Sequence, residues 1–204
     1  MSGDLKETGR VEAFSDGVFA FAITLLVLNL RDPTFDPLLG QISLFQGLLA
    51  QWPSLFALIS SFLTVLIMWV NHHNMFTHIK KINTTFLFLN GLLLFFVVLT
   101  PFTTLLVANH VSFSQTGDGM TAAAVYSGCF LLLGLVWTMV GVYSSRSMLI
   151  TGRRTERRFF VGPVSYTIAF GLSFISGLAS VVVILVAAGF FTVYARELWR
   201  VVPA

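Results

Sequence analysis

The sequence predicts an all-α membrane protein with six transmembrane helices, and its composition, hydropathy and charge distribution each support this fold. Of the 204 residues, 56% are hydrophobic and only 10% are charged, whereas a soluble domain carries roughly a quarter charged residues. Apolar runs of about 18 residues or more, which is the length that crosses a hydrocarbon layer, recur along the chain. These features exclude an ordinary soluble globular domain.

Uninterrupted apolar length locates the six predicted helices within a single domain, residues 1–204. The first four spans are residues 14–30, 53–71, 85–107 and 121–143. Residues 159–194 would form one helix about 54 Å long, which exceeds an ordinary crossing. A tight turn near Ser176 and Gly177 therefore divides this segment into spans 159–176 and 178–194.

The basic residues test this count, because successive loops of a multi-pass protein lie on alternate sides of the membrane. Eleven of the twelve Lys and Arg residues fall on one predicted side, and the other side holds only Arg31, with Asp32, Asp36 and Asp118. The eleven are Lys6, Arg10, Lys80, Lys81, Arg146, Arg153, Arg154, Arg157, Arg158, Arg196 and Arg200. The positive-inside rule then places both termini in the cytoplasm and the protein in the cell membrane.

Four remaining features refine the expected organisation and partners. Residues 32–51, interrupted by Pro33 and Pro37, are too broken to span and are expected to include a short helix at the outer interface. The first apolar stretch lacks a small-residue cleavage site, so we expect it to remain as a helix. The single cysteine, Cys129, excludes an intrachain disulfide. The net charge of +3 is accounted for by orientation, so we expect no nucleic-acid partner.

Polar residues gather at two places of equal predicted depth. Arg10, Ser15 and Asp16 open the first helix, while the second ends in a cluster of aromatic, amide and imidazole side chains. That cluster contains Trp69, Asn71, His72, His73 and Asn74, followed by His78. The simplest interpretation is a hydrogen-bond and ion-pair network that joins the two helices.

The same cluster leaves open a metal site or an intramembrane enzyme built on Asp16, His72, His73 and His78. Adjacent histidines point to different faces of a helix, so their spacing is not diagnostic of a metal site. The sequence contains no recognisable motif of a soluble enzyme. We therefore expect neither a structural metal, nor a cofactor, nor enzymatic activity.

The first helix carries an apolar stripe. On a helix of 3.6 residues per turn, Phe14, Phe21, Leu25 and Leu28 lie along one face, with Thr24 beside them. Spacing alone favours packing or lipid contact for such a stripe over a role in an ion pathway.

The segment from Arg10 to Asp16 matches the pattern RxxxFSD, with Arg10, Phe14, Ser15 and Asp16 at the defined positions, and is followed by a spanning helix. This resembles the signature of the transmembrane protein 175 potassium channel family, in its prokaryotic form of one six-helix repeat per chain. The resemblance implies a homotetramer whose four first helices line a central pore permeable to potassium ions. The sequence has no TVGYG-like segment, in keeping with a family that lacks the carbonyl-lined filter.

The resemblance also implies roles for individual residues. An apolar constriction would fall at Phe21, with further apolar layers at Leu25 and Leu28, and Thr24 would supply a pore-facing hydroxyl. Phe21 departs from the aliphatic residue more usual in the family, so Ile23 is a competing constriction. The structural network would contain Arg10, Phe14, Ser15, Asp16, Trp69, Asn71 and one of His72 or His73.

The functional hypothesis is a potassium-preferring cation channel with a hydrophobic gate on the first helix, surrounded by membrane lipids. A cation- or proton-coupled secondary transporter is the alternative. Such transporters usually contain repeats around a midplane site, and no convincing internal repeat is evident in this sequence. Apart from Asp16 and groups near the loops, no acidic residue lies deep in a predicted span, so coupling to protons or sodium has few candidate carriers.

Overall fold

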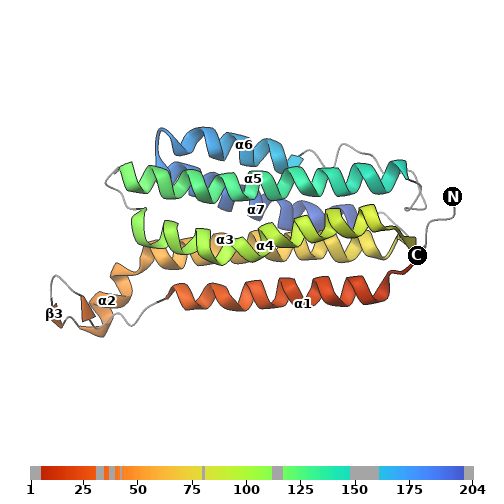
Figure 1. Cartoon of the computed structure of the whole chain (residues 1–204). Helices are drawn as coiled ribbons and strands as arrows, with labels where there is room; N and C mark the ends of the chain where they lie inside the picture. The colour runs from red at the N-terminus through yellow and green to blue at the C-terminus, as the bar shows by residue number, and fades with distance from the viewer. Residues whose placement is uncertain are drawn as a thin grey trace.

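The protein is described by a computed structural model that covers residues 6–30, 35–36, 40–41, 43–79, 81–111, 117–147 and 161–199. Figure 1 shows long helices that lie side by side in one bundle, with successive long helices running in opposite directions. Within the described ranges the helices are α1 (Gly9–Leu25), the 3₁₀ helix η1 (Leu26–Asn29), α2 (Leu44–Ala50), α3 (Trp52–Phe76), α4 (Thr84–His110), α5 (Gly117–Arg146), α6 (Val161–Ser173) and α7 (Gly177–Trp199). The prediction of a mainly α-helical chain is confirmed in these ranges.

Two short antiparallel strand pairs accompany the helices and were absent from the sequence prediction. Strand β1 (Lys6–Glu7) pairs with β4 (Lys81–Ile82), and β2 (Phe35–Asp36) pairs with β3 (Gly40–Gln41). Strands of two residues carry no hydrophobic periodicity, which is why sequence patterns miss them. The first pair joins the segment before α1 to the connection between α3 and α4.

Among the residues that the structure describes, four helical segments are long and apolar enough to cross a membrane: Gly9–Asn29, Trp52–Phe76, Thr84–His110 and Gly117–Arg146. The fifth and sixth predicted spans correspond to α6, with 13 residues, and α7, with a shorter apolar stretch over Gly177–Phe191. The chain reverses between α6 and α7 at residues 174–176, where the sequence predicted a turn. Six crossings therefore remain a prediction.

The helix boundaries differ from the predicted ones mainly at polar ends. Helix α1 begins at Gly9 and not at Phe14, and α3 continues to Phe76 and not only to Asn71. Apolar length located the spans, but polar side chains at these ends bond to neighbouring helices and therefore permit the helices to continue. The α-helical part of the first span ends at Leu25, and the chain continues as η1.

Helix α1 lies at one edge of the bundle, against α3 and α4 (Figure 1). Only 22% of its most apolar window is buried inside the chain, compared with 61% for α5. The remaining helices are more interlocked, because α5 packs on α4, α6 and α7, and α7 also packs on α3. One side of the first helix is thus left uncovered by its own chain.

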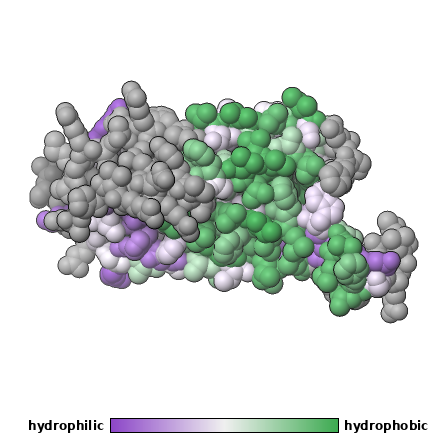
Figure 2. Space-filling view, turned by 180° about the vertical axis from the view of Figure 1, so that it is seen from behind, coloured by the Kyte–Doolittle hydropathy of each residue, from purple (hydrophilic) through white to green (hydrophobic). Residues whose placement is uncertain are grey.

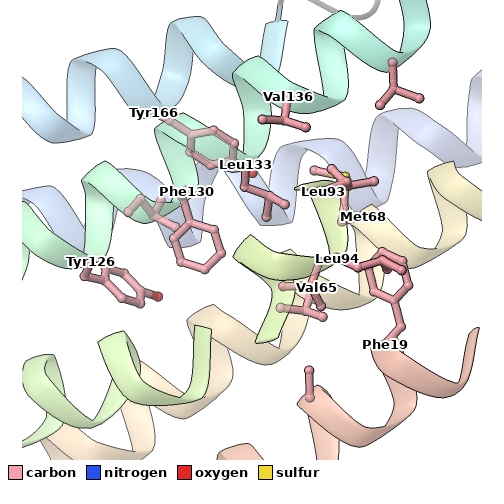
Figure 3. Close-up of a cluster of buried hydrophobic side chains, with 14 of the residues drawn as sticks. Phe19, Val65, Met68, Leu93, Leu94, Tyr126, Phe130, Leu133, Val136 and Tyr166 are labelled. Carbon is pink, nitrogen blue, oxygen red and sulfur yellow. The ribbon is translucent and has the colours of Figure 1, made fainter. Parts of the chain in front are cut away.

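The core lies between α3, α4, α5, α6 and α7, with one aromatic contribution from α1. Figure 3 shows Phe19 reaching from α1 toward Val65, Met68 and Leu94, while other aromatic side chains fill the region around α5. Those labelled there are Tyr126, Phe130 and Tyr166, and the Phe130 and Tyr166 rings stack with centroids 5.8 Å apart. Phe19 is fully buried, so it fixes which face of α1 points inward.

The surface is apolar along the bundle, and hydrophilic residues gather toward the end where α1 begins (Figure 2). At the other end α2 projects from the bundle (Figure 1). Its apolar side chains are exposed, namely Leu44, Phe45, Leu48 and Leu49. A helix is confirmed within residues 32–51, whereas its location at a membrane interface stays a prediction. The basic loop from Arg153 to Arg158 lies outside the described residues.

Candidate functional site

The uncovered face of α1 carries the predicted pathway residues. Phe21 is 62% exposed and Leu28 is 70% exposed, while Thr24 is exposed and Leu25 is half-buried. The inward face of the same helix consists of Phe19, Ala22 and Leu26, each at most 1% exposed. Exposed apolar side chains in such number mark a surface that contacts lipid or another protein chain. We call Phe21, Thr24, Leu25 and Leu28 the outer face of α1.

Thr24 is the polar member of the outer face. Its hydroxyl donates a hydrogen bond to the Phe21 carbonyl oxygen at 2.8 Å, so the hydrogen is used within the helix and the oxygen lone pairs face outward. A hydroxyl in this state can accept a hydrogen bond or contact a cation through its oxygen, but it carries no charge.

Ile23, the competing constriction, lies on a different part of α1. It is half-buried and packs against the hydrophobic core, between the inward and outward faces. Phe21 projects from the surface of the same helix.

The start of α1 is held by polar contacts that we call the base cluster, consisting of Glu12, Ser15, Asp16, Trp69, His72, His73 and Asn90. The indole Nε1 of Trp69 donates to Asp16 Oδ1 at 2.9 Å and so joins α1 to α3. The Trp69 ring also stacks on His73, with centroids 5.9 Å apart. Asp16 is half-buried, and its indole partner is a residue of the second predicted helix that the expected network included.

Ser15 and His72 are both fully buried, and Asn90 of α4 connects them. Asn90 Nδ2 donates to Ser15 Oγ at 2.9 Å, and Ser15 donates onward to the Val11 carbonyl oxygen at 2.8 Å. Asn90 Oδ1 lies 2.9 Å from His72 Nε2. Three helices are therefore linked by one buried hydrogen-bond chain, which satisfies polar groups that would be costly to bury alone.

His73 and Glu12 form the exposed side of the base cluster. His73 Nδ1 lies 3.1 Å from Glu12 Oε1, so these side chains satisfy each other at the surface. Ligand atoms of Glu12, Asp16 and His73 lie within 4.8 Å of one another and are the group of described residues that could hold a metal ion.

The metal set considered from the sequence is not assembled in this arrangement. His72 is enclosed by Asn90, Phe19 and Phe76. His78 makes local contacts with the Asn74 carbonyl oxygen and with Thr77 Oγ1. Asp16, His72, His73 and His78 therefore do not converge on one point.

Three residues of the expected network lie outside its hydrogen bonds. Arg10 is exposed, Phe14 is 66% exposed, and Asn71 is half-buried. Among the residues that the structure describes, none of the three hydrogen-bonds to the base cluster. His72 and His73 both take part, although the sequence suggested only one of them.

Sequence reasoning missed Glu12, Asn90 and a contact at the far end of α1. There the Asn29 side chain is 6% exposed, and its Nδ2 donates to the Pro101 carbonyl oxygen of α4 at 3.2 Å. A polar residue at the end of an apolar run was the available signal for Asn29. For Asn90, the signal was an amide within residues 86–99, whose other members are apolar.

An all-α bundle with several membrane-length helices, an uncovered apolar first helix and buried polar links at its base defines a multi-pass membrane protein. Residues 10–101 match the family described as endosomal/lysosomal potassium channel TMEM175. A potassium channel of Chamaesiphon minutus is 39% identical to the chain over 193 residues, which are 91% of this chain and 93% of the relative. The chain belongs to the TMEM175 potassium channel family, and the resemblance seen in the sequence is confirmed.

Two further comparisons agree with this assignment. A potassium channel of Streptomyces collinus is 39% identical and covers 84% of this chain and 85% of its own. The crystal structure of a lysosomal potassium-selective channel TMEM175 homologue from Chamaesiphon minutus superposes with a TM-score of 0.79, covering 92% of this chain and 97% of that one. The proton channel TMEM175 of Mus musculus matches over 43% of this chain but only 19% of its own length.

Proposed function

We propose that this protein is a potassium-preferring cation channel of the cell membrane, with four copies of the chain arranged so that their α1 helices surround one pore. The observation that carries this proposal is the uncovered apolar outer face of α1, which holds Phe21, Thr24, Leu25 and Leu28 on an edge helix. Relatives that align over most of the chain are named potassium channels. The homotetramer, six crossings and cytoplasmic termini belong to this proposal.

The outer face would act as a hydrophobic gate. Four Phe21 rings around an axis, followed by Leu25 and Leu28, offer an ion no replacement for its hydration shell when they are close together. Water leaves a narrow apolar ring, and the ion is then blocked by the cost of dehydration. Separation of the rings would admit a hydrated or partly hydrated cation.

Potassium preference would arise without a filter of backbone carbonyls, since the sequence lacks a TVGYG-like segment. Thr24 hydroxyls supply weak, uncharged ligands, and potassium loses its hydration shell more readily than the smaller sodium ion. The preference would therefore be moderate. The permeating potassium ion is the cargo of this channel, and we expect it to need no cofactor.

The base cluster has a supporting role in this proposal. Its hydrogen bonds link α1 to α3 and α4 at one end, while the outer face of α1 remains free for neighbouring copies. Glu12, Asp16 and His73 lie near the predicted cytoplasmic entrance, but their bonding is internal to the chain.

Recording from purified protein in a lipid bilayer tests the proposal. With potassium on one side and sodium on the other, the current should reverse toward the potassium equilibrium potential and rise steadily with voltage. Saturable flux that stops when a counter-ion or proton gradient is removed would instead identify a coupled transporter. Absence of any current from correctly assembled protein would contradict the channel.

A further inference from the structure

The outer end of α1 differs in geometry from the rest of the helix. The α-helix stops at Leu25 and continues as the 3₁₀ helix η1, and Leu30 is extended. Leu28, the last residue of the outer face, lies in η1. Because 3₁₀ hydrogen bonds have poorer geometry than α-helical ones, a short 3₁₀ segment depends on tertiary contacts to keep its shape.

Asn29 makes the polar tertiary contact that holds η1. Its side chain is 6% exposed and donates to the Pro101 carbonyl oxygen at 3.2 Å, while Leu26 packs beside it at 1% exposure. Across the described part of the chain, this is the hydrogen bond by which η1 reaches another helix. Loss of the amide would leave η1 attached by apolar packing alone.

Pro101 makes α4 a bendable partner. Proline has no N–H, so α4 lacks the hydrogen bond that would otherwise reach the Val97 carbonyl oxygen, and helices bend at such points. The turn on either side is nevertheless well anchored. Thr104 donates to the Thr100 carbonyl oxygen at 2.7 Å and lies 2.8 Å from Ser61 of α3.

The anchor extends to α5, because the Ser61 hydroxyl also lies 2.9 Å from the Tyr126 hydroxyl. All three of Ser61, Thr104 and Tyr126 are fully buried. The carbonyl that receives the Asn29 amide therefore belongs to a turn that is fixed to two other helices. Polar contacts hold α1 at its base through Ser15 and Asp16 and at its outer end through Asn29.

We infer that Asn29 is a positioning residue for the gate: its hydrogen bond to the proline turn of α4 holds Leu28 and the rest of η1 in place, and we assign the arrangement held in this way to the closed channel. The inference rests on the proposed channel function. Between the two polar attachments, the residues from Phe19 to Leu26 contact the chain mainly by apolar packing, which tolerates sliding. Releasing the outer attachment frees the end that carries Leu28.

The test compares Asn29→Leu with wild type in single-channel recordings. Four equivalent hydrogen bonds in a tetramer should together favour the closed state, so their loss should raise the fraction of time open by roughly tenfold. Conductance of the open channel should stay unchanged, since Asn29 faces α4 and not the outer face. Ser127→Ala, which removes a buried hydroxyl that bonds within α5, is the control and should leave the open fraction unchanged.

A second measurement does not require current. In a Cys129→Ser background, Leu28→Cys should react several-fold faster with a soluble thiol reagent when Asn29→Leu is also present. Asn29→Ala replaces Asn29→Leu in this measurement if the leucine variant does not assemble. Asn29→Gln keeps an amide donor, so its Leu28→Cys reactivity should be closer to that of wild type. Unchanged open fraction and unchanged Leu28→Cys reactivity in an assembled variant would overturn the inference. Absence of current in wild type, with faster labelling in the variant, would contradict the channel and not the positioning role.

Discussion

The side chain of Asn90 fixes the tautomer of His72. Ser15 donates its only hydroxyl hydrogen to Val11, so it must accept from Asn90 Nδ2. Asn90 Oδ1 is then the end that faces His72 Nε2, and the ring must donate through that nitrogen. The other ring nitrogen, His72 Nδ1, is buried and has no hydrogen-bond partner among the residues that the structure describes. The ring is thereby oriented by α4, although it belongs to α3.

Asn90→Leu tests this arrangement. The change removes an acceptor from His72 and a donor from Ser15, and unsatisfied buried polar groups cost about 1 to 3 kcal/mol each. We expect a clear fall in the thermal stability of the purified protein. Asn71→Leu, at a half-buried position of α3, is the comparison and should have a smaller effect. Equal melting temperatures for the Asn90 variant and wild type would refute a structural role for the hydrogen bonds that join Ser15, Asn90 and His72.

Asp16→Ala should weaken assembly by removing the acceptor of the Trp69 indole. The expected loss is about 1.5 to 3 kcal/mol, the range for a hydrogen bond to a charged group, because Asp16 is only half-buried. Thermal melting and size-exclusion chromatography measure the effect. Asp16→Asn keeps an oxygen that can accept from Trp69 and should recover most of the loss; an equally stable alanine variant would show that this bond contributes little.

The gate is tested at Phe21. Phe21→Asn should increase cation current by lowering the dehydration barrier in the pore, and Phe21→Cys should make the current sensitive to a soluble thiol reagent. Phe19 is unsuitable as the control, because it is fully buried against His72 and its replacement would disturb the fold. Phe190→Asn is a better match, since Phe190 is 56% exposed on α7, away from α1.

The same recordings decide the register of the pathway. Polar substitutions at Thr24, Leu25 and Leu28 should change the cation current as those at Phe21 do, because these residues share the outer face. Ile23 packs toward the core, so its substitution should have less effect on the current. A response confined to Ile23 would move the constriction but keep the channel. No response at any of these positions in assembled protein would exclude α1 from the pathway.

Membrane orientation follows from the distribution of basic residues and is measurable at two exposed, described positions. In a Cys129→Ser background, Thr77→Cys should be protected from an impermeant thiol reagent added to intact cells. Asp118→Cys should react, because the α4–α5 connection is predicted to be outside. The opposite labelling pattern would reverse the topology and place both termini outside.

The sequence was sufficient for the helical class because apolar length is a property of each segment alone. Positions within α1 were also predictable, since helical periodicity separates Phe21 from Phe19. The partners of polar residues were not. The sequence placed Asp16 and Trp69 in one expected network, but it did not show that the indole Nε1 would donate to this carboxylate. Proximity between helices depends on their packing, which no single segment encodes.

Asn29 and Pro101 illustrate the same limit at the outer end. Both were visible in the sequence, one at the end of a span and one inside another. Their 72-residue separation hides the contact, and a proline within a helix does not reveal which side chain its carbonyl will meet. Phe19 also looks similar to Phe21 in the sequence, only two positions away, but tertiary packing makes it the buried anchor of α1.

The edge position of α1 separates the lining of the proposed channel from the interior of its subunit. A substitution at Phe21, Thr24 or Leu28 alters side chains that the subunit's own core does not use. New permeation properties can therefore arise by exchange of a few surface residues, with little penalty to folding. In such an arrangement the pore lining is a replaceable surface of the subunit. Ion preference can therefore diversify without compensating mutations in the subunit core.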